Sequence, residues 1–172
     1  MKEKFKIVKV DYNYCDYLRG FDEKVCYNSG QKELRPYIGI LFEINECKYF
    51  APLSSPKLKH QHMENTLDFI KISNGKLGAI NFNNMIPLKD ECYKLMNLKN
   101  VSESRDRKYN HMLNLQLRWL NRNYNYIMGR AENLYKKYSN NLLDYRTKKR
   151  CCNFLLLEEK CKEYTNTVKT KN

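Results

Sequence analysis

The sequence of 172 residues lacks a long hydrophobic run and an export signal. Its longest apolar runs, at 37–42 and 154–157, are far shorter than the roughly 20 residues that a membrane span needs. The N-terminus is charged and no apolar segment follows it, which is not the pattern of a secretory leader. We therefore expect a cytoplasmic protein without membrane contact.

Patterns typical of metal and cofactor sites are also missing. The seven cysteines are odd in number and include no Cys-x-x-Cys pair, because the only close pair is Cys151 and Cys152, which are adjacent. There is no glycine-rich phosphate loop, no Gly-x-Ser-x-Gly elbow and no paired-carboxylate motif. We expect reduced thiols, no metal and no cofactor.

Positive charge is what the sequence has in excess. Its net charge is +13, with residues 1–86 at +3 and residues 87–172 at +10. Fourteen tyrosines are interleaved with the basic residues, and single-stranded nucleic acid is commonly held by stacking on aromatic rings. This combination favours a nucleic-acid-binding protein but does not choose between RNA and DNA. The alternative is that the charge only keeps the protein soluble while the tyrosines fill a core.

The pattern in the first half predicts strands. Alternating apolar residues and turn chemistry indicate two hairpins, preceded by one strand and a short helix. We expect the second strand of the first hairpin to end before an irregular segment bracketed by Pro52 and Pro56. The expected elements are a strand at 5–10, a helix at 12–20, a loop at 25–35, a hairpin of 37–44 with 47–51, and a hairpin of 68–72 with 79–87.

The pattern in the second half predicts helices. A continuous apolar stripe at steps of three and four runs from Leu113 to Tyr138, with Gly129 as a possible break between two helices, and a last helix is capped by Asn153. Strands followed by helices predict an α+β fold with an antiparallel sheet. We expect a single domain over 1–172, with a mostly β core at 1–90, a mostly helical basic part at 102–164 and a frayed tail at 165–172.

The segment 51–60 carries the strongest candidate chemistry. Ser54, Ser55, Lys57, Lys59 and His60 follow one strand within ten residues, and hydroxyls and ammonium groups can stabilise charge on a phosphate. The same residues also make an ordinary turn.

The predicted first hairpin brings a second segment toward this one. If 37–44 pairs with 47–51, the start of the first strand lies beside the end of the second, which places Arg35 and Tyr37 near the serines. Arg35 could clamp a phosphate with two hydrogen bonds, although a surface arginine before a proline is common. The asparagine-rich segment 77–87 is better explained by backbone hydrogen bonds than by a ligand.

Three blocks resemble a known family. The segment 49–57, YFAPLSSPK followed by His60, resembles the core motif of the type III toxin–antitoxin endoribonucleases, the ToxN/AbiQ family. The segment 78–87, GAINFNNMIP, resembles the second block of the family, and 152–160 resembles its C-terminal helix. The likeness covers nearly the whole chain.

This resemblance implies a compact, barrel-like twisted antiparallel sheet with helices, similar to the Kid/MazF toxins. It also implies metal-independent RNA cleavage, in which a 2′-hydroxyl attacks to leave a 2′,3′-cyclic phosphate and a 5′-hydroxyl. The implied partners are a small repeat RNA antitoxin, expected to fold as a pseudoknot and form a higher-order protein–RNA assembly, and a cellular or phage RNA substrate. The implied role is phage defence by abortive infection.

Residue roles follow from the motif matches. Lys57 stabilises the phosphorane, Ser54 and Ser55 donate to it, Arg35 holds a phosphate, and His60 either transfers a proton or contacts RNA. Tyr27, or else Tyr37, corresponds to an active-site tyrosine of the family. The residues expected to contact RNA are Tyr37, Lys59, Arg118, Arg122, Lys148, Lys149 and Arg150. For the last three, a solvated helix face is the alternative, and a non-catalytic nucleic-acid-binding protein is the rival function.

Overall fold

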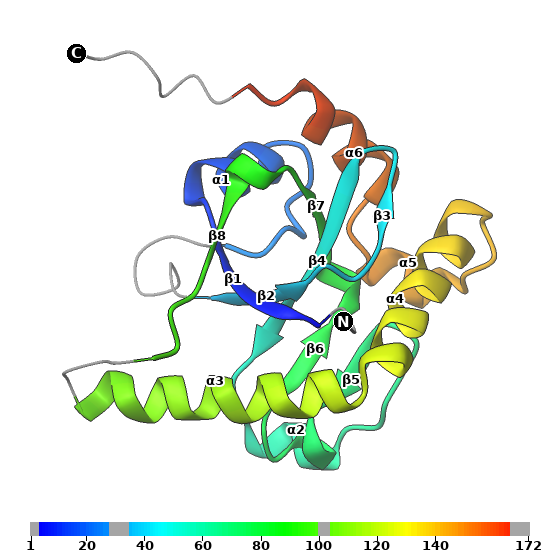
Figure 1. Ribbon diagram of the computed structural model, residues 1–172. Helices are drawn as coiled ribbons and strands as arrows, with labels where there is room; N and C mark the ends of the chain where they lie inside the picture. Colours follow the sequence, from blue (N-terminus) through cyan, green and yellow to red (C-terminus); the bar gives the residue numbers. More distant parts are fainter. Residues whose placement is uncertain (1–3, 28–34, 100–103, 166–172) are drawn as a thin grey trace, which may run out of the picture.

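The computed structural model describes residues 4–27, 35–99 and 104–165, with the side chains of 104 and 105 excepted (Figure 1). Strands fill the first part of the chain and most of the helical residues follow them, so the predicted α+β class with an antiparallel sheet is confirmed. The expected loop at 25–35 and the expected frayed tail at 165–172 lie largely outside the described residues.

All strand pairs in the sheet are antiparallel, and its main path runs β5-β6-β4-β2-β1-β8. The strands are β1 (Lys6–Val10), β2 (Pro36–Gly39), β3 (Glu43–Ile44), β4 (Cys47–Ser54), β5 (Phe69–Lys71), β6 (Ala79–Asn81), β7 (Ile86–Leu88) and β8 (Tyr93–Leu95). In the part of the chain that the structure describes, the path ends at β5 and β8, so the sheet is open and does not close into a barrel.

Strand β4 is the centre of the sheet. It pairs with β2 and β3 along one edge and with β6 and β7 along the other, because Lys48 lies opposite Glu43 on one side and Leu88 on the other. The first hairpin is therefore confirmed, although its first arm is divided into β2 and β3. The expectation of an irregular segment after residue 51 is wrong, because β4 stays paired through Ser54.

The second hairpin is also confirmed in part. Strands β5 and β6 pair through a turn over Ser73–Gly75. The segment 79–87 is not one strand, however, because the 3-10 turn Phe82–Asn84 redirects the chain into β7, which pairs with β4.

The helices are α1 (Tyr12–Arg19), α2 (Leu58–His62), α3 (Ser104–Arg122), α4 (Tyr124–Ser139), α5 (Tyr145–Arg150) and α6 (Phe154–Glu163). The break in the long stripe falls at Asn123 and not at Gly129. The Asn123 amide donates to the Trp119 carbonyl at 2.8 Å, so the side chain competes with the helical backbone, whereas Gly129 lies inside α4. Asn153 caps α6 as predicted, through Leu156 N.

Buried side chains from the sheet and the helices form one core. Helix α6 packs on β7 and β4, and α3 crosses beside β1 (Figure 1). Polar contacts also join α6 to β4: the buried Tyr49 hydroxyl donates to the Glu158 carboxylate at 2.6 Å. None of the helices in the described residues has the length and apolar character of a membrane span.

Candidate active site at the end of β4

A hollow of about 210 Å³ opens where β4 ends and β2 begins. Its lining residues are Arg35, Pro36, Leu53, Ser54, Ser55, Lys57 and Tyr109. Two cations, two serines and one tyrosine therefore line one space, and among the described residues no carboxylate lines it. The hollow can attract and hold an anion such as a phosphodiester.

The strand register explains this convergence. Tyr37 lies opposite Pro52 and Ile38 opposite Ala51, so extending the pairing by two residues brings Arg35 to the level of Ser54. The sequence predicts this neighbourhood, and the geometry agrees. The Arg35 Nε is buried and has no hydrogen-bond partner in the described part of the chain.

Ser54 is held by the segment that leads into β6. Gly78 has φ +95°, and a Cβ there would lie 1.9 Å from the Ser54 carbonyl oxygen, so only glycine fits. The Asn81 Nδ2 donates to the Ser54 Oγ at 2.7 Å. The Gln116 amide of α3 donates to the Leu77 carbonyl at 2.7 Å and reaches the Ser54 carbonyl at 3.5 Å. These contacts fix the end of β4.

Helix α3 supplies one wall of the hollow through Tyr109. Burial raises the pKa of the Tyr109 phenol, while the Arg35 charge opposes that rise. The phenol is therefore neutral at physiological pH. It can give a hydrogen bond or a stacking surface but not a negative charge.

The other residues predicted for catalysis lie outside the hollow. His60 is 3% exposed and packs against Phe69, with ring centroids 5.9 Å apart. Burial, followed by the charges of Lys57 and Lys59, lowers its pKa, so the imidazole is neutral at pH 7. Tyr27 is half exposed and lies under the Arg19 guanidinium, 4.9 Å from its ring centroid.

Tyr37 corrects a prediction. Its side chain is completely buried, so its ring is not available for stacking on RNA. Its hydroxyl is likewise buried and has no hydrogen-bond partner among the described residues. The hairpin register does place Tyr37 opposite Pro52, but the side chain of Tyr37 points into the core.

Most of the residues predicted to contact RNA are exposed. Lys59 lies on α2, and Lys148 and Lys149 lie on α5, where Lys149 is near the exposed Tyr145 ring. Arg118 and Arg122 of α3 border a shallow hollow that also includes Lys4.

Arg150 departs from that prediction. Its guanidinium donates two hydrogen bonds, of 2.8 and 2.9 Å, to the carboxylate of Asp68, which is 2% exposed. Burial of Asp68 opposes its ionisation, but the hydrogen bonds from Arg150 and Thr66 outweigh burial and hold its pKa below the ordinary value. Arg150 thus compensates a buried charge and joins α5 to the start of β5.

Three neighbours of the site were missed by sequence reasoning: Asn81, Tyr109 and Gln116. Gln116 had a usable signal, because it is a polar residue between Leu113 and Leu120 on an apolar helix face, and the structure buries it completely. Asn81 stood in a segment interpreted as structural, which is correct for Asn84, whose amide donates to the Lys24 carbonyl. Tyr109 had no distinguishing signal.

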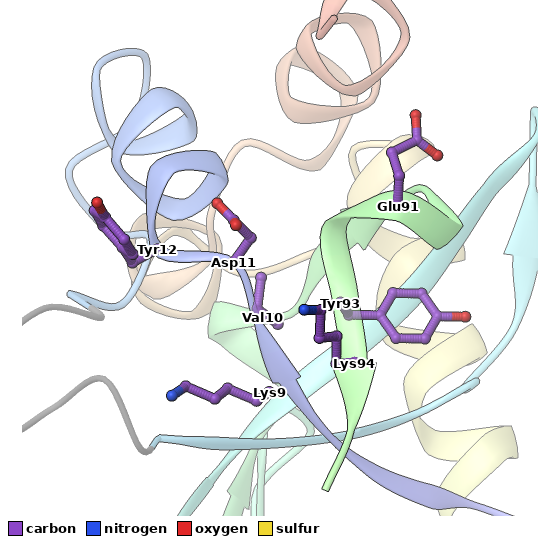
Figure 2. Close-up of a pocket in the computed structure, with 7 residues that line it drawn as sticks. All are labelled: Lys9, Val10, Asp11, Tyr12, Glu91, Tyr93 and Lys94. Atoms are coloured by element: carbon purple, nitrogen blue, oxygen red, sulfur yellow. The ribbon is translucent and has the colours of Figure 1, made fainter. Parts of the chain in front are cut away.

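A second hollow, of about 340 Å³, lies at the β1–β8 edge (Figure 2). Lys9 and Lys94 are opposite each other in the register of these strands, and Tyr12 and Tyr93 stand nearby. Asp11 and Glu91 also line this space. Because its charges are mixed, this hollow is less suited to a polyanion than the one beside Ser54.

Comparison with known proteins gives consistent matches. The family profile described as "Toxin ToxN, type III toxin-antitoxin system" matches residues 6–162. Endoribonuclease ToxN of Pectobacterium atrosepticum is 34% identical, with 92% of this chain and 93% of the relative covered. Endoribonuclease AbiQ of Lactococcus lactis subsp. lactis is 30% identical, with coverage of 88% and 85%.

Solved structures share the fold. One comes from work on selective toxin inhibition by a non-coding RNA pseudoknot in type III toxin–antitoxin systems. It has a TM-score of 0.80 at 29% identity, and the match covers 95% of this chain and 99% of the solved chain. Another, the lactococcal anti-phage endoribonuclease AbiQ, has a TM-score of 0.80 at 25% identity, with coverage of 94% and 98%.

Proposed function

The chain belongs to the ToxN family and is an endoribonuclease toxin of a type III toxin–antitoxin system, and from that premise we propose that it cleaves RNA in the hollow at the end of β4. The observation that carries this proposal is the convergence of Arg35, Ser54, Ser55 and Lys57 in one space that no carboxylate of the described residues lines. In this arrangement the β half supplies the chemistry of a single endoribonuclease domain, and the basic helical half supplies contacts to RNA.

The proposed reaction is a transesterification that needs no metal. The 2′-oxygen attacks the adjacent phosphorus and loses its proton, while the 5′-oxygen leaves and gains one, giving a 2′,3′-cyclic phosphate and a 5′-hydroxyl. Lys57 stabilises charge on the phosphorane, and the Ser54 and Ser55 hydroxyls donate to its non-bridging oxygens. Arg35 holds the scissile or adjacent phosphate through its guanidinium, which lines the hollow. We assign no reacting role to the buried His60.

We further propose that a small repeat RNA restrains the toxin. A related toxin was solved in work on inhibition by an RNA pseudoknot, and another in work on a processed non-coding RNA that regulates a bacterial antiviral system. By analogy, this chain binds a pseudoknot antitoxin in a higher-order protein–RNA assembly, acts in the cytoplasm and cuts cellular or phage RNA during phage defence. Lys59, Arg118, Arg122, Lys148 and Lys149 are the proposed RNA contacts.

Substitution at the hollow tests the site. Losing one preorganised donor to a developing oxyanion costs on the order of 100- to 1,000-fold in rate, so Lys57→Ala and Ser55→Ala should lose cleavage and toxicity while folding normally. Lys9→Ala is the matched control, because Lys9 is an exposed lysine in the other hollow. Wild-type cleavage by a folded Lys57→Ala variant would remove the proposed site, and RNA bound but left intact by the wild type would favour a non-catalytic binder.

A further inference from the structure

The Ser54 side chain has a hydrogen-bond partner to which the proposed mechanism assigns no role. Its Oγ lies 2.7 Å from the Asn81 Nδ2, and Asn81 is the last residue of β6. Ser54 itself lies opposite Ala79 in the register of β4 and β6. Two adjacent strands therefore bring the amide and the hydroxyl together, with the hydroxyl on the rim of the hollow.

The direction of this hydrogen bond matters for chemistry. A serine hydroxyl has one proton to donate and two lone pairs that can accept. An amide N–H can only donate, so Asn81 occupies a lone pair of Ser54 and leaves the hydroxyl proton free. A donated hydrogen bond also polarises the hydroxyl and strengthens the one it gives.

We propose that Asn81 is a positioning residue, which fixes Ser54 as a hydrogen-bond donor toward the phosphate oxygens. This inference rests on the proposed role of Ser54. Among the described residues that line the hollow Asn81 is not included, so its proposed effect on the phosphate passes through the Ser54 hydroxyl. In the variant Asn81→Asp the direction of this hydrogen bond should reverse. The carboxylate accepts a hydrogen bond from the Ser54 hydroxyl, which then no longer donates to the phosphate.

The test combines two variants of Asn81 with Ser54→Ala, each assayed as the full chain on a randomised single-stranded RNA. Asn81→Leu keeps the side-chain volume and removes the donor, and we expect cleavage to fall about tenfold, the effect of one neutral hydrogen bond. In the Ser54→Ala background the same change should have almost no effect. Equal losses in both backgrounds would make Asn81 merely structural and overturn the proposal.

The pH profile of Asn81→Asp supplies the second readout and carries the test if Asn81→Leu does not fold. Below the pKa of the new carboxyl the protonated group can donate again, so the rate relative to wild type should rise as the pH is lowered from 7 toward the ordinary aspartate pKa of about 3.9. Asn83→Asp is the matched control, because it adds the same charge to the next turn, where the Asn83 amide faces the Arg150 carbonyl at 3.5 Å. It should show no such rise. A flat ratio for Asn81→Asp would overturn the proposal.

Failure of the inference and failure of the proposed function are distinguishable. If Ser54→Ala cleaves RNA as fast as wild type, the role of Ser54 is wrong and the role of Asn81 falls with it. If Ser54→Ala is slow but Asn81→Leu and Asn81→Asp match wild type at every pH, the site stands and only the positioning role is overturned.

Discussion

Replacing Arg150 with alanine should destabilise the protein without weakening its hold on RNA. The change removes hydrogen bonds of 2.8 and 2.9 Å from the carboxylate of Asp68, whose side chain is 3% exposed. Removing one partner of a buried ion pair costs about 3–5 kcal/mol. The Arg150 side chain is 49% exposed and Thr66 still donates to Asp68 at 3.0 Å. We therefore expect a loss of about 2–3 kcal/mol, below that range because solvent screens an exposed partner.

The dependence on pH tests the same reasoning. In the wild type the pKa of Asp68 is held below its ordinary value, so the pair stabilises the fold above that value and the stabilisation is lost as the pH falls through the lower folded pKa. Without Arg150 its hydrogen bonds and charge no longer oppose the effect of burial, so the pKa of Asp68 should be higher in the variant than in the wild type. The difference between the two proteins should shrink as the pH approaches 4.

Urea denaturation measures both effects, with Lys149→Ala as the control. Lys149 is the exposed neighbour on α5, and its removal should change the free energy of unfolding by less than about 0.5 kcal/mol. An Arg150→Ala protein as stable as wild type, or a difference that is constant from pH 7 to pH 4, would refute the argument. Weaker RNA binding by the folded variant would restore Arg150 to the RNA interface.

Three further predictions follow from the site and its surroundings. Cleavage should persist in excess EDTA and leave 2′,3′-cyclic phosphate ends, and activity that is lost on chelation and restored by magnesium would contradict the proposed mechanism. Replacing both Lys148 and Lys149 with alanine should weaken antitoxin binding and flatten the plot of log affinity against log salt concentration by roughly 0.9 for each phosphate that the protein no longer neutralises. Titration of labelled antitoxin RNA at several salt concentrations measures this slope, and an unchanged slope would make the two lysines part of a solvated helix face. Gly78→Ala should lower the free energy of unfolding by at least about 1–3 kcal/mol because residue 78 has a positive φ, and it should slow cleavage by moving Ser54. Gly129→Ala is the control, because a Cβ there meets no atom of the described residues within 4 Å. In thermal denaturation it should stabilise α4 by about 0.5–1 kcal/mol.

The hairpin and the capped last helix were predictable because they depend on local chemistry. The turn after β3 and the alternating strands set the register that brings Arg35 to Ser54, and the Asn153 cap needs only the first turn of α6. The division of the long helix was misplaced because glycine is not required for a break. A side chain at residue 123 that hydrogen-bonds the backbone is sufficient.

The hydrogen bonds that hold the site could not be predicted, since each joins residues from distant parts of the chain. Asn81 reaches Ser54 only through the pairing of β6 with β4, and Gln116 reaches Leu77 only after α3 packs beside the sheet. Arg150 illustrates the same limit for charge. A basic run at the end of a short helix gives no sign that one member is matched to a buried aspartate 82 positions away.

The central position of β4 limits how this toxin can be restrained. Four strands flank β4 along its length, and its last residue, Ser54, is paired with Ala79 of β6, so β4 cannot separate from the sheet as an edge strand could. Its amides should be among the slowest to exchange with deuterium, near the rate set by global unfolding. Opening β4 would then cost a large share of the folding free energy. We therefore expect an RNA inhibitor of this chain to act by covering the proposed site rather than by distorting it.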